Sequence, residues 1–187
     1  MTHSYHHGDL RRALIEAAVE AIAEDGPSSL SLRAVAKRAG VSHAAPAHHF
    51  GDKAGLLTAV AVQGHERFAA ALEGAWRATG DFVEVGVAYM RFAIDNRAYF
   101  ETMFRPELLH ADDPELERAA ARSRAVLYRG AGDADADGNE RTYHPSALAA
   151  WSLVHGFSEL LLGGNLTQEV GEDPEAILRD LGSRLRL

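Results

Sequence analysis

Cysteine is absent from this chain of 187 residues. That absence excludes a disulfide framework, a thiolate metal site and a cysteine nucleophile. Long apolar stretches are also missing: no run of about 18 apolar residues occurs, so we expect no membrane-spanning helix. Residues 1–7 contain no apolar segment of the kind that forms a secretory signal. The sequence therefore favours a cytoplasmic globular protein, and its 47% hydrophobic content is ample for a core.

Patterns typical of β-strands and of internal repeats are missing as well. Apolar residues instead recur at spacings of three and four, the period of a helix with one buried face. Glycine and proline residues separate these segments. We expect an all-α fold, with Gly64 as a candidate break and residues 130–142 as an acidic loop. The expected helices span about residues 9–25, 32–39, 42–50, 52–78, 82–103 with an interruption near Asn96, 114–129, 145–162 and 173–185.

Residues 32–50 are expected to form two short helices joined by a tight turn. Apolar residues recur at i, i+3, i+4 and i+7 between Leu32 and Ala39. Gly40 supplies a left-handed residue that ends the first helix, and we expect the Ser42 hydroxyl to cap the second. This is the pattern of a helix-turn-helix, whose second helix lies in the major groove of DNA. An ordinary corner between two helices is the alternative.

The flanking segments favour the DNA-binding interpretation. Asp9–Asp25 has the apolar stripe of an amphipathic helix and stops at Gly26-Pro27. Beyond the second short helix, Asp52 is expected to cap a further helix that carries Lys53 in its first turn. A cation there is unfavourable for the helix dipole. A phosphate docked at that helix N-terminus would account for the lysine.

From about Tyr5 to about Val62 the chain resembles the TetR family of bacterial transcriptional repressors. The resemblance rests on Leu32–Ala36, Ala39–Ser42 and His49–Leu57. It implies an N-terminal three-helix DNA-binding domain, here residues 1–53, and a helical-bundle ligand-binding and dimerisation domain, here residues 54–187. It also implies a non-enzymatic, ligand-responsive repressor that binds a palindromic operator in double-stranded DNA as a homodimer.

Two further segments refine this resemblance. Trp151–Gly156 resembles the Trp-His-Gly segment of one TetR subgroup. In contrast, Ala47 stands where the family usually has a tyrosine that touches the DNA backbone, and His48 stands where arginine or lysine is common. Two phosphate contacts are therefore expected to be weakened or missing. The alternative function is a ligand-binding or interaction module whose DNA binding has decayed.

Charge and histidine are unevenly distributed. Residues 1–60 hold six Lys/Arg and six Asp/Glu, so the formal charge of −8 lies in the rest of the chain. The same residues hold six of the ten histidines. His43 and His48 are five apart, roughly 140° around a helix, so they do not form a metal-ligand pair. We expect no metal site and no cofactor. Because histidine changes charge between pH 5 and 8, operator binding is expected to be tighter at about pH 6 than at about pH 8.

The expected DNA contacts lie at the starts of the helices and along the second short helix. His43 and Ala44 begin that helix, where side chains usually meet base edges. The Ala44 or Ala45 methyl group suits contact with a thymine methyl, and Lys53 is the best phosphate contact. Lys37 and Arg38 are expected only to be solvated. The expected DNA-binding residues are Ser31, Arg33, Ser42, His43, Ala44, Ala45, His48, His49 and Lys53.

A small-molecule effector pocket in the second domain is implied by the resemblance, not by the residue pattern. Its expected lining is aromatic, but aromatic residues at helical spacing are also typical of a core. In that alternative His155 makes a buried hydrogen bond to Glu159, one turn away. The expected ligand-binding residues are Tyr89, Phe92, Phe100, Met103, Phe104, Trp151 and His155.

A helical-bundle enzyme with His155 and Glu159 as an acid–base pair is the rival function. No nucleophile motif, phosphate loop or metal-ligand spacing supports it. Residues 145–162 and 173–185 are apolar and terminal, and we expect them to form the dimer interface. Two copies would make a four-helix bundle across a two-fold axis.

Overall fold

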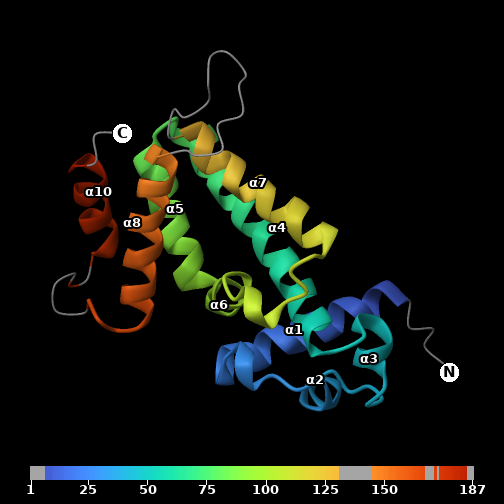
Figure 1. Cartoon of the computed structure of the whole chain (residues 1–187). Coiled ribbons are helices and arrows are strands. Elements are labelled where there is room, and N and C mark those ends of the chain that lie inside the picture. Colours follow the sequence, from blue (N-terminus) through green and yellow to red (C-terminus); the bar gives the residue numbers. More distant parts are fainter. Residues whose placement is uncertain (1–6, 131–144, 167–170, 172, 185–187) are drawn as a thin grey trace. The chain divides into compact units, whose positions relative to one another are not determined.

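The computed structural model describes residues 7–130, 145–166, 171 and 173–184 (Figure 1). Every regular element within these ranges is helical, as the sequence predicted. None of their helices has the length and apolarity that a membrane crossing requires. Of the acidic loop expected over residues 130–142, Gly130 is the last residue of a helix, and residues 131–142 lie outside the described residues.

The described residues form two compact units. The N-terminal unit takes in residues 1–65 and 97–119, and the C-terminal unit takes in residues 66–96 and 120–187. The long helix α4 (Lys53–Thr79) and the helix α7 (Pro114–Gly130) each contribute to both units. The domain boundary expected after residue 53 on functional grounds stays a prediction.

The N-terminal unit is built around α1, which packs against α2 and α6, while α2 also packs against α3. Its core contains fully buried aliphatic side chains from α1, α2 and α4, among them Leu14, Val35 and Leu56. Its elements, besides the first part of α4 and the start of α7, are α1 (His7–Asp25), η1 (Pro27–Ser29), α2 (Leu32–Arg38), α3 (Ala45–Phe50), α6 (Arg97–Met103) and η2 (Pro106–Leu108).

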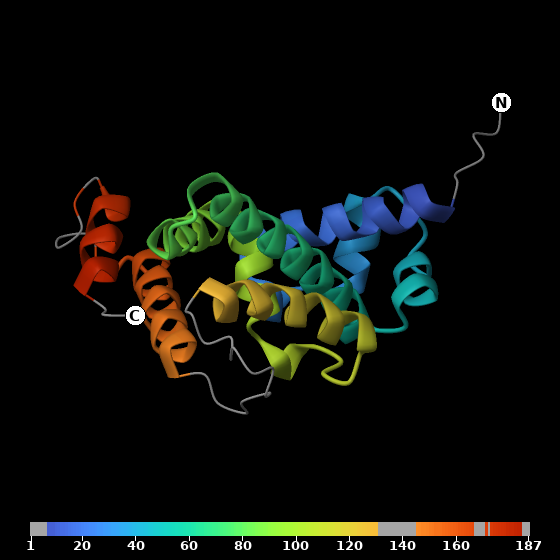
Figure 2. The ribbon, with the colours of Figure 1, turned by 90° about the horizontal axis from the view of Figure 1, so that it is seen from above.

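The C-terminal unit has α5 (Phe82–Asp95) at its centre. This helix packs against both α8 (Pro145–Leu162) and α10 (Pro174–Arg184), and α10 lies beside α8 (Figures 1 and 2). The core gathers aromatic and aliphatic side chains of α4 and α5, including Phe68, which lies 2% exposed. This arrangement leaves α8 and α10 as the outermost pair next to α5.

Most expected helix ends are confirmed. The break between α5 and α6 falls at Asn96, and α8 has the predicted bounds. The break considered at Gly64 is wrong, because α4 runs through this residue without interruption. A Cβ at Gly64 would lie 3.3 Å from Cβ of Tyr99 and 3.4 Å from the sulfur of Met103. This glycine therefore serves the close approach of α6 and not the end of a helix.

Candidate nucleic-acid interface and effector region

The first short helix and its turn form as the sequence predicted. The Ser31 hydroxyl accepts a hydrogen bond from the Ala34 N–H at 3.2 Å and caps α2. Gly40 has a φ of +67°, a conformation that glycine adopts without strain. The Val41 N–H then reaches back to the Ala36 carbonyl at 3.0 Å. This backbone closure ends α2 and directs the chain toward α3.

The start of the second short helix differs from the prediction. The structure begins α3 at Ala45, with Ala44 as its N-cap and no side-chain capping bond, so the expected Ser42 cap is wrong. His43 and Ala44 lie in the preceding turn. Pro46 explains the shift, because it lacks an N–H and fits a helix only in the first turn. In a helix capped by Ser42, Pro46 would lie beyond the first three helical residues, where its missing N–H would cost a hydrogen bond of the helix.

An ion pair fixes α2 against α1. The Arg38 guanidinium donates two hydrogen bonds to the Glu24 carboxylate, one of 2.9 Å, and lies 3.5 Å from Glu20. The bonds to Arg38 hold the pKa of Glu24 below its usual range. Arg38 was expected only to be solvated, and that prediction is wrong. The two carboxylates lie 14 and 18 residues before it, a separation that carries no periodic pattern.

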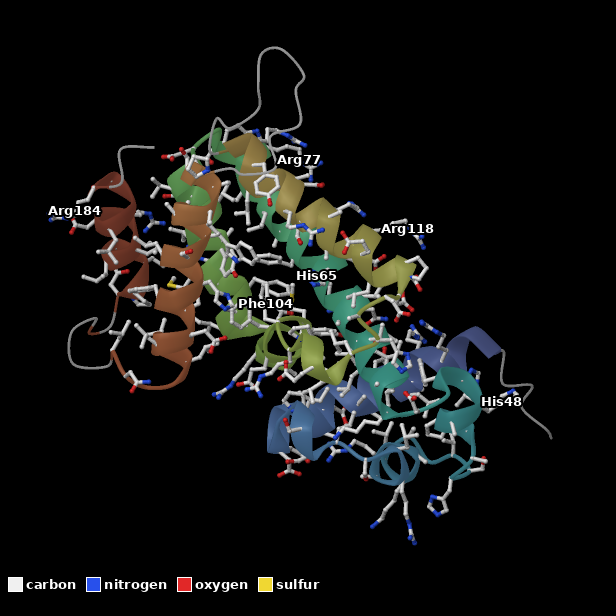
Figure 3. The ribbon with its side chains drawn as sticks, viewed as in Figure 1. His48, His65, Arg77, Phe104, Arg118 and Arg184 are labelled. Carbon is white, nitrogen blue, oxygen red and sulfur yellow. The ribbon has the colours of Figure 1, made fainter. Side chains whose placement is uncertain are left out.

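The outer face of α3 and the turn before it combines small and imidazole side chains. His43, Ala44, Ala47 and His48 are exposed, whereas Pro46 is buried. His48 is labelled in Figure 3. This exposed face contains no arginine or lysine of α3 itself, because the helix sequence has none.

Contacts on the other side of α3 anchor it. Phe50 is half-buried, and the Arg11 guanidinium of α1 lies 5.4 Å from its ring centroid, within cation–π range. The His49 ring is also half-buried and lies 6.2 Å from the Phe50 ring between centroids. The expected DNA contact His49 is thus turned partly toward the interior.

Cations on α2 complete the exposed face. Arg33 and Lys37 are exposed, and the side chain of neither makes a hydrogen bond or ion pair within the described part of the chain. Lys37 was expected only to be solvated and Arg33 to meet phosphate. Both side chains have their full set of N–H donors available, in contrast to Arg38.

The first turn of α4 is held at two points. The Asp52 carboxylate accepts the Gly55 N–H at 2.8 Å, which confirms the predicted cap and, as the largest cause, lowers the pKa of Asp52. Lys53 donates to the Ser28 carbonyl at 2.6 Å. One of the three ammonium hydrogens of Lys53, the best expected phosphate contact, is therefore engaged within the protein.

A third contact at this turn was not predicted. The His110 Nε2 lies 3.2 Å from the Asp52 carboxylate, and the His110 N–H donates to the Thr58 hydroxyl at 2.9 Å. The segment after α6 is thereby joined to the turn that follows α3. Asp52 and His110 lie far apart in the sequence, which explains why no sequence pattern indicates this pair.

The expected ligand-binding residues fall into two groups. Phe100, Met103 and Phe104 belong to the N-terminal unit, where the Phe104 ring lies 6.1 Å from the His65 ring between centroids. Both residues are labelled in Figure 3. The remaining residues belong to the C-terminal unit and are Tyr89, Phe92, Trp151 and His155.

Within the C-terminal unit, Tyr89 is the hub of a hydrogen-bonded aromatic cluster. The Trp151 indole donates to the Tyr89 hydroxyl at 3.1 Å, and this hydroxyl lies 2.8 Å from Nδ1 of His155. Phe68 packs edge-on to the Tyr89 ring with centroids 4.7 Å apart. Burial raises the pKa of Tyr89 and lowers the pKa of His155. His155 Nδ1 thus has the Tyr89 hydroxyl as a partner, while the charge of Glu159 raises the pKa of His155 against the effect of burial.

Apolar side chains of α8 and α10 stay exposed. Leu148 is 44%, Leu160 47% and Ile177 36% exposed. The two helices form a groove whose lining residues are Leu153, Gly156, Phe157, Leu160, Leu166, Ile177 and Leu181. These are the segments expected to form a dimer interface, apart from residue 185, which lies outside the described residues.

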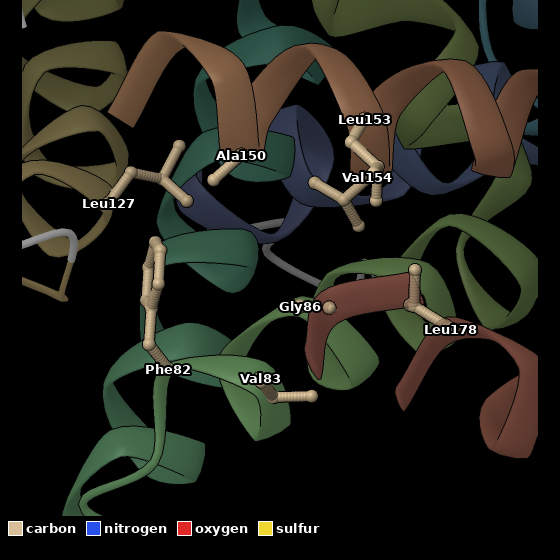
Figure 4. Close-up of a pocket in the computed structure, with 9 residues that line it drawn as sticks. Phe82, Val83, Gly86, Leu127, Ala150, Leu153, Val154 and Leu178 are labelled. Carbon is tan, nitrogen blue, oxygen red and sulfur yellow. The ribbon is translucent and has the colours of Figure 1, made fainter. Parts of the chain in front are cut away.

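A second apolar hollow lies in the C-terminal unit between α5, α7, α8 and α10 (Figure 4). Its cavity volume is about 50 Å³, and the unfilled space reaches about 450 Å³ only when the part open to solvent is counted. None of the expected ligand-binding residues is among the described residues that line it. The sequence prediction missed this hollow because four separate helices create it.

Comparisons with known proteins agree with this geometry. Residues 14–60 match the family model "Bacterial regulatory proteins, tetR family", and residues 82–185 match the model "Tetracyclin repressor-like, C-terminal domain". An uncharacterised helix-turn-helix-type transcriptional regulator of Mycobacterium tuberculosis is 28% identical over 178 residues, covering 94% of this chain and 79% of the relative.

Solved structures also match nearly the whole chain. A protein of unknown function from Rhodococcus sp. RHA1 is 33% identical with a TM-score of 0.78, covering 97% of this chain and 96% of the other. A bacterial regulatory protein in the tetR family from Rhodococcus RHA1 shares the fold at 22% identity, with a TM-score of 0.66 and 93% of both chains covered.

Proposed function

The chain belongs to the tetR family of bacterial regulatory proteins and is a DNA-binding transcriptional regulator, and we propose that it is a ligand-responsive repressor that binds a palindromic operator as a homodimer. The exposed face formed by α2, the turn and α3 is the observation that carries this proposal. We further propose that it works in the cytoplasm without catalytic activity and that residues 1–53 are the part that contacts DNA.

On this proposal α3 enters the major groove and the flanking elements contact phosphates. The exposed His43 and the methyl group of Ala44 are placed for base edges, where a methyl group suits contact with thymine. Arg33 is exposed for phosphate contact, and Lys53 still has two ammonium hydrogens after its bond to the Ser28 carbonyl. The remaining proposed contacts are Ser31, whose hydroxyl hydrogen is not used by its cap, together with Ser42, Ala45, His48 and His49.

The exposed apolar groove of α8 and α10 supports the proposed dimer. Burial of exposed leucine and isoleucine side chains against a second copy would remove apolar surface from water. A two-fold axis through this groove would pair four helices and present two recognition helices about 34 Å apart, the spacing of successive major-groove turns. The proposed effector changes this spacing, which requires that it bind one conformation better than the other.

Ala47 and His48 favour a second candidate function. Both are exposed on α3, where the TetR resemblance leads one to expect a tyrosine and a basic residue that touch phosphates. A ligand-binding module with decayed DNA binding would retain the α8–α10 groove but would not bind any duplex selectively. The stronger operator binding expected at about pH 6 than at about pH 8 depends on the exposed histidines and stays a prediction.

Selection of bound duplexes from a random-sequence pool tests the proposed function. We expect enrichment of an inverted repeat whose half-site centres lie about 10 base pairs, or a multiple of that, apart. Leu160→Glu combined with Ile177→Glu should give monomers in sedimentation and abolish selective binding. Ile94→Glu is the matched control, because Ile94 is 42% exposed on α5 and lies outside the groove. A pool without enrichment would instead favour the decayed module.

A further inference from the structure

Among the described residues, those that line the apolar hollow of the C-terminal unit have carbon-rich side chains or are glycines. The four helices that surround it contribute phenylalanine, leucine, valine, alanine and glycine, and no lining residue in the described part of the chain has a charged, amide or hydroxyl side chain. A water molecule needs two to four polar partners to be stable in a buried space. The enclosed part of the hollow is therefore a poor site for water and a favourable one for an apolar group.

Gly86 keeps this space open. It lies in the interior of α5, where a glycine costs about 1 kcal/mol relative to alanine. A Cβ at this position would meet no atom within 4 Å, so close helix packing does not require the glycine. Gly182 on the facing helix α10 differs, because its Cβ would lie 3.1 Å from a Val83 methyl group. Of these two glycines, close helix packing explains Gly182 but not Gly86.

The Phe82 ring forms one end of the hollow and is held in place. In Figure 4 its ring extends toward Leu127 of α7. A Cβ at Gly130 would lie 2.3 Å from an atom of this ring, so the glycine that ends α7 gives the ring its room. The ring is thus a wall of the hollow that packs against the backbone of α7 at Gly130. Aromatic rings stack favourably on the face of such a ring.

We propose that the hollow binds a small, neutral, apolar molecule, preferably aromatic, and that this molecule is the effector of the regulator. The effector part of this inference rests on the proposed function. The site differs from the Tyr89 cluster, whose polar groups do not line the hollow. Leu153 of α8 lines both the hollow and the α8–α10 groove. An occupant that contacts Leu153 and Leu178 therefore acts on the two helices of the proposed dimer interface.

Methyl-labelled protein titrated with p-xylene tests the site by nuclear magnetic resonance. We expect saturable shifts of the methyl groups of Val83, Leu127, Val154 and Leu178, and no saturation with the charged probe benzoate. Gly86→Leu should fill the space and weaken p-xylene binding by roughly tenfold or more. Gly74→Leu is the matched control. Gly74 also lies inside a helix of the same unit, with no atom within 4 Å of an added Cβ, but does not line the hollow.

The outcomes separate the site from the function. Equal p-xylene affinity in wild type and Gly86→Leu, or no saturable shift in wild type, would overturn the site. The effector role requires that p-xylene change operator affinity in wild type and in Gly74→Leu but not in Gly86→Leu. Saturable binding without any change in operator affinity would overturn the effector role. If the protein binds no operator at all, the proposed function fails while the methyl shifts still decide the site.

Discussion

The Tyr89 hydroxyl lies 2.8 Å from Nδ1 of His155 and joins α5 to α8 in the interior of the C-terminal unit. The same hydroxyl accepts the Trp151 indole N–H at 3.1 Å. With one hydroxyl hydrogen and a donor already on its oxygen, Tyr89 is placed to donate to a neutral His155 ring. This relationship gives the aromatic cluster a polar centre whose energetic role can be measured.

Tyr89→Phe removes this hydroxyl and nothing else. We expect a loss of about 1–3 kcal/mol in the free energy of unfolding, because buried polar groups lose a partner. Urea denaturation measures the loss. Tyr99→Phe is the control, since the Tyr99 hydroxyl bonds the half-exposed Gln63 at 3.3 Å and water can replace it. A smaller loss for Tyr89→Phe than for Tyr99→Phe would contradict the account.

Acid should destabilise the protein through His155. Burial lowers the pKa of His155 in the folded chain, whereas an unfolded histidine has a pKa of about 6.5. Between these values the unfolded chain binds more protons, so this contribution to stability is present above about pH 6.5 and is lost as the pH falls through the lower folded value. We expect Tm to fall from about pH 7.5 to about pH 5.5 by more in wild type than in His155→Gln. An equal fall in Tm for wild type and His155→Gln would contradict this prediction.

Alanine substitutions at two helix-interior glycines should change the free energy of unfolding in opposite directions. Gly86→Ala should raise the free energy of unfolding by about 1 kcal/mol, because the new methyl group meets no atom and the helix gains propensity. Gly64→Ala should lower it, because its Cβ would crowd Tyr99 at 3.3 Å. Urea denaturation of both variants measures the difference. A similar increase in the free energy of unfolding for Gly64→Ala would contradict this prediction, because it would mean that α6 moves to accommodate the added methyl group at little cost.

Substitutions of the basic residues of α2 should affect either the salt dependence of DNA binding or the stability of the protein, according to the contacts of each side chain. Arg33→Ala should reduce the slope of log affinity against log salt by about 1, because it removes a proposed phosphate contact. Arg38→Ala should leave the slope unchanged and lower Tm, because Arg38 holds α2 on α1 through Glu24. Fluorescence anisotropy with operator DNA gives the slopes, and a scanning melt gives Tm. A reduced slope for Arg38→Ala alone would reverse these roles.

The sequence predicted the features that depend on neighbouring residues. Gly40, Asn96 and Pro145 mark helix ends because backbone conformation and missing N–H groups act locally. The predicted start of α3 is too early because Pro46, and not the capping tendency of Ser42, decides where this helix begins. Local rules therefore conflict where two of them apply to the same turn.

Features that join distant segments could not be predicted. His155 follows Tyr89 by 66 residues, so helical spacing indicates only its neighbour Glu159, one turn away, as a partner. The sequence predicts a solvated Arg38, because its partners Glu20 and Glu24 lie on another helix, α1, that packs against α2. The hollow beside Gly86 exists because glycine has no side chain to fill it. The spacing of apolar residues in the sequence does not indicate such a space.

Binding of the purified protein to the DNA that flanks its own gene, across a salt titration, tests the central claim most directly. Fluorescence anisotropy should show selective binding by two chains per site, with affinity falling steeply and linearly on logarithmic axes as salt rises. The slope would count the phosphate contacts made despite Ala47 and His48. Weak binding that is equal for unrelated duplexes, with no sequence enriched from a random pool, would contradict the account.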